Sequence, residues 1–174
     1  MTKDEISTLI RFNFWANGRI LAACEHLTPD QFNSNVTPDP GWGSLHNILV
    51  HILDTEYGWR AVLQGEPADI ILEAKDFPDI ATLKAAWHKE KIAWLDYVKE
   101  LADEEVHQKR EGNSLNVWQT IMHVVTHGTQ HRSEAAHILT GHDMSPGELD
   151  FDLFLQENPQ PNEISHLAKN GNNR

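Results

Sequence analysis

The sequence predicts an all-α protein, an antiparallel four-helix bundle with a short extra C-terminal helix. Apolar residues recur at helical spacing over four long segments. Each segment has roughly 20 residues, which at a rise of about 1.5 Å per residue gives a helix about 30 Å long, the height of a bundle. Stretches rich in proline, glycine and asparagine separate these segments, and the alternating polarity typical of strands is nearly absent.

The first predicted helix spans residues 2–27. Thr2 and Glu5 have the spacing of a capping box, in which each side chain bonds the backbone N–H of the other residue. The apolar positions of this helix are Ile6, Leu9, Ile10, Phe14, Leu21 and Cys24. Thr28 begins another short helical turn, and the loop NSNVTPDPGWG after it contains too much proline and glycine to continue a helix.

The second long helix is expected over residues 44–63, because Gly65 and the proline that follows it end the apolar pattern. Residues 66–78 then form a long connection, which we expect to cross over the end of the bundle. Asp79 can cap the third helix, which the apolar pattern extends over residues 79–101.

A polar linker leads to the fourth long helix, residues 116–140, which Gly141 ends. A short helix with the sequence ELDFDLFLQE follows it. The pattern contains no internal repeat and no sign of a second domain. We therefore predict one domain over residues 1–157 and a polar, disordered tail over residues 158–174.

The composition fits a single domain of a cytoplasmic protein. A chain of 174 residues can form one sizeable core, and no apolar run approaches the roughly 20 residues that span a bilayer. The N-terminal residues mix acidic and basic side chains, unlike a signal peptide. Cys24 is the only cysteine, so no disulfide forms within the chain, which suits a reducing compartment.

The charge of the chain indicates which partners to expect. The formal net charge is −12, and no cluster of lysine and arginine offsets it locally. An acidic surface repels phosphate backbones and anionic lipid headgroups, so we expect neither nucleic acid nor a membrane as a partner. The eleven histidines, together with the acidic balance, point to cations instead.

The segment MHVVTHGTQHR contains three histidines at intervals of four, His123, His127 and His131. Residues four apart lie on one face of a helix, so a neighbouring pair can share a metal ion. All three cannot, because the first and third are about 12 Å apart along the axis and a zinc–nitrogen bond is only about 2 Å. On a helical wheel His127 and His131 lie at the rim of the apolar face, whereas His123 lies almost opposite to it. This arrangement favours the second pair.

A metal ion held by protein alone needs a third ligand from another element, and His51 is the best candidate. On the second long helix this residue lies about 60° from the centre of the apolar face, at the edge of the buried stripe. The second and fourth long helices would then present three imidazoles to one cleft. The alternative for each of these residues is a hydrogen-bonded structural histidine that binds no metal.

Four segments resemble, in order, the motifs of the DinB/YfiT-like superfamily of metal-dependent enzymes. They are FNFWANGRIL, GSLHNILVHILDTEYGW, MHVVTHGTQHR and MSPGELDFDLFL, and they cover residues 1–156. The resemblance implies a four-helix bundle, often a homodimer, with a three-histidine metal site. The ligand positions of the family correspond to His51, His127 and His131. Relatives often have H-R-G-Q after the ligand pair, where this chain has H-R-S-E, so the surroundings of the metal differ here.

The resemblance also implies a cofactor and a class of reaction. The cofactor would be a divalent metal ion, zinc or nickel in the first place, with iron or manganese as alternatives. Relatives include transferases that join low-molecular-weight thiols such as bacillithiol, mycothiol or glutathione to other substrates. Because zinc deprotonates a bound thiol, we expect a transferase that directs a small thiol to an electrophile.

Two other functions remain open at this stage. A metal-bound hydroxide could hydrolyse an amide or an ester with the help of a general base. Glu134 is the nearest acid on the helical wheel, and Asp54 and Glu56 follow His51. The third possibility is a non-catalytic, metal-stabilised dimer in a stress response. Arg132 is a candidate to bind a substrate carboxylate, with an ion pair to another helix as the alternative.

Overall fold

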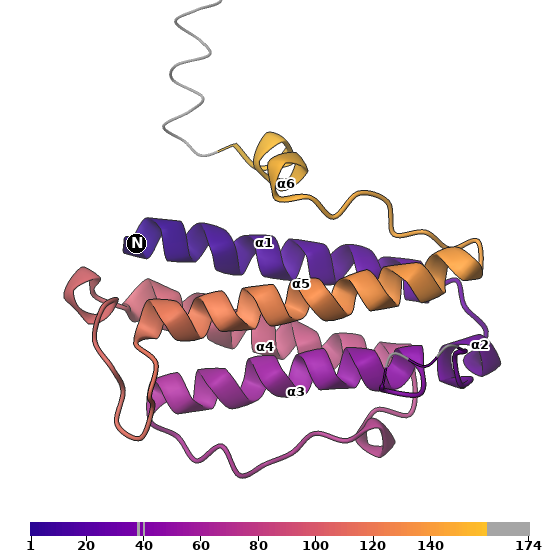
Figure 1. Cartoon of the computed structure of the whole chain (residues 1–174), viewed down its shortest axis with the longest axis horizontal. Helices are drawn as coiled ribbons and strands as arrows, with labels where there is room; N and C mark the ends of the chain where they lie inside the picture. The colour runs from indigo at the N-terminus through magenta and orange to yellow at the C-terminus, as the bar shows by residue number, and fades with distance from the viewer. Residues whose placement is uncertain (38, 40, 160–174) are drawn as a thin grey trace, which may run out of the picture.

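The computed structural model describes residues 1–37, 39 and 41–159, and over these residues the chain is helical (Figure 1). The four long helices are α1 (Lys3–Cys24), α3 (Leu45–Gln64), α4 (Ile80–Glu100) and α5 (Val117–Gly141). The short ones are α2 (Pro29–Asn33), α6 (Phe151–Glu157) and the 3-10 turns η1 (Ala74–Asp76) and η2 (Asp103–Glu105). The predicted all-α bundle with a short extra C-terminal helix is confirmed.

Parts of the predicted tail lie beyond the part of the chain that the structure describes. The disorder expected after residue 159 concerns residues outside the described ranges. Among the described residues, none of the helices has the length and apolar character needed to cross a membrane. The last described helix, α6, begins at Phe151, three residues later than the sequence indicated. Gly147, just before the predicted start, has a φ of 75°, which lies outside the helical range.

Side chains at the helix starts explain why the long helices begin where the sequence indicated. Thr2 and Glu5 form the predicted capping box, with the Glu5 N–H donating to Thr2 Oγ1 at 3.2 Å and the Thr2 N–H donating to Glu5 Oε2 at 2.8 Å. Side chains of Ser44, Asp79 and Asn116 accept in the same way at the starts of α3, α4 and α5. Each cap satisfies a backbone N–H that has no partner inside its helix.

The helices do not simply alternate in direction. α1 packs against α4 and α5, and α3 packs against the same two helices on the other side. The expected antiparallel arrangement holds for α1 with α4 and for α3 with α5. Residues 65–79, here called the crossover segment, return along the length of the bundle, so α3 and α4 run in the same direction (Figure 1).

Our expectation that this connection crosses over the end of the bundle was wrong. The crossover segment follows the side of α3, and the Leu72 N–H donates to Asp54 Oδ1 at 2.7 Å half-way along that helix. An extended chain advances about 3.3 Å per residue, so a segment of this length can return over the full height of a bundle.

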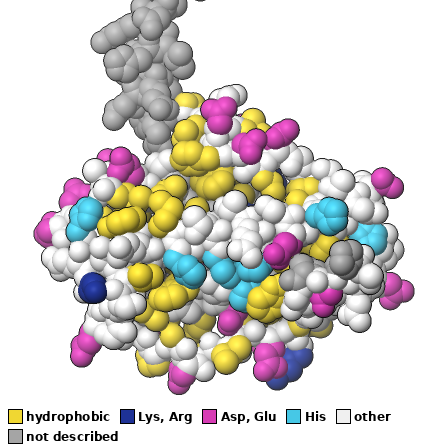
Figure 2. All heavy atoms as spheres, viewed as in Figure 1, with side chains coloured by type: hydrophobic (Ala, Val, Ile, Leu, Met, Phe, Trp, Pro, Cys, Tyr) yellow, Lys and Arg dark blue, Asp and Glu magenta, His cyan; other side chains and the backbone are white. Residues whose placement is uncertain are grey.

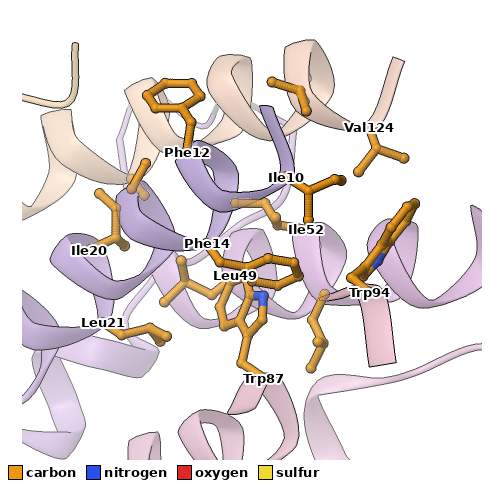
Figure 3. Close-up of a cluster of buried hydrophobic side chains, with 14 of the residues drawn as sticks. Ile10, Phe12, Phe14, Ile20, Leu21, Leu49, Ile52, Trp87, Trp94 and Val124 are labelled. Atoms are coloured by element: carbon orange, nitrogen blue, oxygen red, sulfur yellow. The ribbon is translucent and has the colours of Figure 1, made fainter. Parts of the chain in front are cut away.

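The core is centred on aromatic side chains of α4. Trp94 is fully buried and Trp87 is 3% exposed. Figure 3 shows both indoles directed into the space between α1 and α3, where Phe14, Leu49 and Ile52 meet them. Both tryptophans are therefore core residues of the bundle.

One charged residue of α4, Glu90, is buried in the bundle. It is 6% exposed and pairs with Arg60 of α3. The Arg60 Nε and Nη2 groups donate to the two carboxylate oxygens at 2.6 and 2.9 Å. The two-pronged pair satisfies both charges where the parallel helices α3 and α4 cover them.

Candidate metal centre

Three histidines from two helices converge at the surface of the bundle. His51 of α3 lies opposite His127 and His131 of α5, and one ring nitrogen of each lies within 4.8 Å of the others. The His51 and His127 Nε2 atoms are 2.9 Å apart. These three residues, here called the histidine group, are the ones that the sequence singled out. Figure 2 shows histidine side chains gathered in the middle of one face of the molecule.

The geometry of the histidine group fits a divalent metal ion. In a tetrahedral site with metal–nitrogen bonds of about 2.05 Å, two ligand nitrogens lie about 3.3 Å apart. The separations here run from 2.9 Å to at most 4.8 Å, so small side-chain rotations bring all three nitrogens to one ion. The donor set is also suitable, because imidazole is a common ligand of zinc, nickel, copper and iron.

A carboxylate fixes the orientation of one ring of the group. Glu134 Oε2 lies 2.7 Å from His131 Nδ1, one turn along the same helix. When Nδ1 carries the proton for this bond, Nε2 is left free as the ligand atom. Glu134 therefore lies next to the candidate centre, as the helical wheel indicated, but its bonded partner is a ligand histidine.

Trp42 forms a wall of the site that the sequence did not reveal. Its indole stacks on the His51 ring with centroids 3.6 Å apart and planes at 19°, and it meets the His131 ring edge-on at 5.7 Å. The residue belongs to the loop before α3, far from any helical pattern. Its only signal in the sequence is an aromatic residue between two glycines.

Burial favours the uncharged form of two of the three histidines. It lowers the pKa of His127 to about 4, and the neighbouring His131 and His51 add to the effect. The pKa of His51 is lowered as well, first by burial and then by His131. Only the uncharged imidazole binds a metal ion, so both rings are in the ligand form at neutral pH. His127 Nδ1 is buried and has no hydrogen-bond partner among the described residues.

His123 stands apart from the group, as the helical wheel indicated. Its side chain is exposed, and its ring meets the edge of Trp59 with centroids 5.3 Å apart. The His127 ring is its nearest neighbour in the group at 5.8 Å. His123 is therefore a useful reference residue, one helical turn from the site.

The comparison with known families agrees with this picture. The model of the DinB family matches residues 1–163. The chain belongs to the DinB family. It is also similar to protein DinB of Bacillus subtilis (strain 168), with 23% identity over 159 residues that cover 84% of this chain and 91% of the relative. The family resemblance stated from the motifs is thus confirmed.

The next residue along α5 points into the DinB bundle instead of toward the histidine group. Arg132 is 2% exposed, and its Nη1 donates to Asn13 Oδ1 at 2.7 Å and to Asn17 Oδ1 at 2.8 Å. Burial lowers the pKa of this guanidinium to about 10. The alternative to a substrate carboxylate was an ion pair to another helix. Arg132 does contact another helix, α1, but its acceptors there are amides and not acids.

The two asparagines link Arg132 to a buried acid, Glu56, through hydrogen bonds. The Nδ2 groups of Asn13 and Asn17 donate to Glu56 Oε1 at 2.6 and 2.7 Å, and Trp87 Nε1 donates to Oε2 at 2.6 Å. Burial raises the pKa of Glu56 to about 7, against the opposing effect of these hydrogen bonds. These residues, with Arg132, form what is here called the Glu56 network. Glu56 lies inside the bundle and is not an acid of the candidate centre.

A glycine of α5 makes room for the network. A Cβ atom at Gly128 would lie 2.6 Å from Arg132 Nη1 and 2.9 Å from Asn13 Oδ1. The guanidinium can therefore pass along the helix to reach α1 only because this position has no side chain. Sequence reasoning did not find this role, since the glycine looked like any other residue in a helical pattern.

Proposed function

We propose that this DinB-family protein holds one divalent metal ion at His51, His127 and His131, zinc or nickel first. We further propose that it uses the ion to direct a low-molecular-weight thiol to an electrophile. The observation that carries the proposal is the convergence of three imidazoles from two helices on one point. Neutral imidazole ligands would leave a bound divalent ion its charge of +2, and such an ion would lower the pKa of a thiol bound to it so that the thiol releases its proton to water.

Side chains of the chain itself would prepare this centre. Glu134 holds the Nδ1 proton of His131, which aims Nε2 at the ion and makes the ring a stronger donor. Trp42 covers one face of His51 and restricts the rotation of that ring. Both contacts place ligand atoms before a metal ion arrives, which lowers the entropy lost on binding.

The acids near the site favour the thiol over metal-bound hydroxide. Hydrolysis asks for a free general base within reach of water. Glu134 is engaged with His131 and Glu56 lies inside the bundle, so Asp54, with one oxygen bonded to the Leu72 N–H, is the one candidate acid that keeps a free oxygen. Transfer from a thiol needs no such base, because the metal ion itself promotes loss of the thiol proton.

The test measures metal and activity in the same samples. Protein purified without a polyhistidine tag is analysed for metals by mass spectrometry, as the wild type and as His131→Ala. Turnover of a fluorogenic electrophile is then followed with each of several small thiols. We expect about one metal ion per chain and thiol-dependent turnover in the wild type, and neither in His131→Ala.

His123→Ala is the matched control, since it removes an exposed histidine of the same helix. It should keep both metal and turnover. A filled site without turnover for any thiol would refute the transferase and support the non-catalytic alternative. Ester hydrolysis without thiol would support the hydrolase instead.

A homodimer is also part of the proposal, and it rests on the family resemblance. Sedimentation equilibrium of the full-length protein measures it directly. A mass of twice 19.8 kDa is expected. A monomer at micromolar concentration would remove the dimer from the proposal and leave the metal centre unaffected.

A further inference from the structure

A groove of about 330 Å³ adjoins the histidine group on the side of the crossover segment (residues 65–79). Its lining includes Val50 of α3, Trp42 of the loop before α3 and Ile71 of the crossover segment. His51 belongs both to this groove and to the candidate metal centre. A volume of this size holds a small organic molecule of about ten heavy atoms.

The walls of the groove are largely apolar. Ile71 is 73% exposed, a high value for a large aliphatic side chain, and it lines the groove together with Trp42 and the half-buried Leu72. A ligand with an apolar body would cover these side chains and remove their surface from water. Ile70, its neighbour on the crossover segment, is 56% exposed but does not line the groove.

The charge inside the groove is negative. Asp54 is half-buried in the wall, and the Leu72 N–H occupies its Oδ1, which leaves the charge and Oδ2 for a ligand. Glu73 at the edge pairs with Lys75. Neither lysine nor arginine is among the described residues that line the groove. On the face shown in Figure 2, basic side chains lie at the edges, away from the histidines.

We propose that this groove binds a small organic amine, with its apolar body against Trp42, Val50 and Ile71 and its ammonium group on Asp54. The electrophile of the proposed function would carry this ammonium group on the same molecule as the atom that the thiol attacks, and in this respect the inference rests on the proposed function. The binding itself involves only the groove, and it requires no metal ion.

The test compares three ligands of one shape and different charge: benzylamine, benzyl alcohol and benzoate. Each is titrated at pH 7 into the full-length protein, and NMR follows the indole N–H of Trp42, assigned with Trp42→Phe. The titrations are run with the metal that the protein carries and after its removal by a chelator, because benzoate could bind a metal ion directly. In the chelated protein we expect benzylamine to bind most tightly and benzoate most weakly.

Substitutions in the groove test which residues cause the expected order of ligand affinities. Asp54→Asn keeps an acceptor for the Leu72 N–H and removes the charge, so benzylamine should bind about fivefold more weakly, and benzyl alcohol as before. Ile71→Ser should weaken both ligands about threefold through lost apolar contact. Ile70→Ser is the matched control and should change neither.

The outcomes separate this inference from the proposed function. Benzoate binding as tightly as benzylamine to the chelated protein would overturn it, as would equal effects of Ile71→Ser and Ile70→Ser. Absence of any Trp42 response to the three ligands would also overturn it. Amine binding in a protein that takes up no metal would leave the groove assigned and refute the metal centre. A protein that carries metal and is active with a thiol but binds no amine would support the metal centre and refute the amine site.

Discussion

The histidine group and the Glu56 network both use residues of α3 and α5, but the first lies at the surface of the bundle and the second lies inside it. His131 and Arg132 are consecutive on α5, and His51 and Glu56 are little more than one turn apart on α3. One step along a helix turns the side chain by about 100°, so the histidines reach the rim while the charged pair enters the core. The clusters therefore lie back to back.

The difference between the clusters is in how many of their polar atoms are bonded. Both oxygens of Glu56 accept hydrogen bonds, and the guanidinium of Arg132 donates to two amides, so the Glu56 network joins all four long helices. In the histidine group no described residue bonds His127 Nδ1, and the His51 and His127 rings face each other through Nε2. A fully bonded cluster holds a fold together, whereas an incompletely bonded one has donor atoms left for a ligand.

Replacing the adjacent residues of α5 by the same side chain tests this contrast most strongly. Arg132→Met should lower the free energy of unfolding by about 4 kcal/mol, because it leaves the buried asparagines and Glu56 without their cation. His131→Met should abolish metal binding, and in metal-free protein it should change the free energy of unfolding by no more than about 1 kcal/mol. Urea denaturation of both variants measures the difference. Equal losses of stability would show that the two clusters are not distinct.

The buried acid predicts a pH dependence of the opposite sign to that of an ordinary ion pair. The folded-state pKa of Glu56 is about 7, above its ordinary value of 4.5. Below pH 4.5 the group is protonated in both states and stability is undiminished. Between pH 4.5 and 7 the unfolded chain ionises first, so the folded state loses stability, by on the order of 3 kcal/mol in all.

Comparison with Glu56→Gln isolates this effect. His46, His51 and His127 have lowered pKa values, so their contribution rises with pH over an overlapping range and would hide the trend in the wild type alone. Urea unfolding of both proteins at pH 5 and pH 8 gives the difference. We expect the wild type to lose stability relative to the variant as pH rises. A difference independent of pH would mean that Glu56 ionises equally in both states.

Gly128→Ala sharpens the comparison by adding one methyl group beside the Glu56 network. The new Cβ would lie 2.6 Å from Arg132 Nη1, so the guanidinium must shift away from Asn13, at about 2 kcal/mol of stability. Gly58→Ala in α3 is the control, because nothing lies within 4 Å of its Cβ. It should be neutral or stabilising by up to about 1 kcal/mol. Thermal unfolding of the two variants measures the difference. Equal melting temperatures would contradict a close approach of the Arg132 guanidinium to Gly128.

Glu134→Gln gives the smallest expected effect, on the histidine group alone. The amide oxygen can still accept from His131 Nδ1, but the negative charge is lost, so metal affinity should fall about tenfold. Glu104→Gln in η2 removes an equal charge from an exposed position and should leave the affinity unchanged. Competition with a chromogenic chelator measures both. An unchanged affinity in Glu134→Gln would show that this carboxylate does not support the metal centre.

The amino-acid sequence determined the local features of this protein. Caps such as Thr2 and Asn116 and the apolar spacing defined the four long helices within a few residues, because these signals act through neighbours in the chain. The interval of four between His127 and His131 placed both on one helix face for the same reason.

Only the tertiary structure decided how these local units meet. The crossover segment made α3 and α4 parallel, which buried Glu90 against Arg60. The loop brought Trp42 onto His51, and the crossover segment formed the groove beside it. Helical spacing fixes which residues share a face, but the partner of that face depends on packing between segments far apart in the chain, and that packing carries no periodic signal in the sequence.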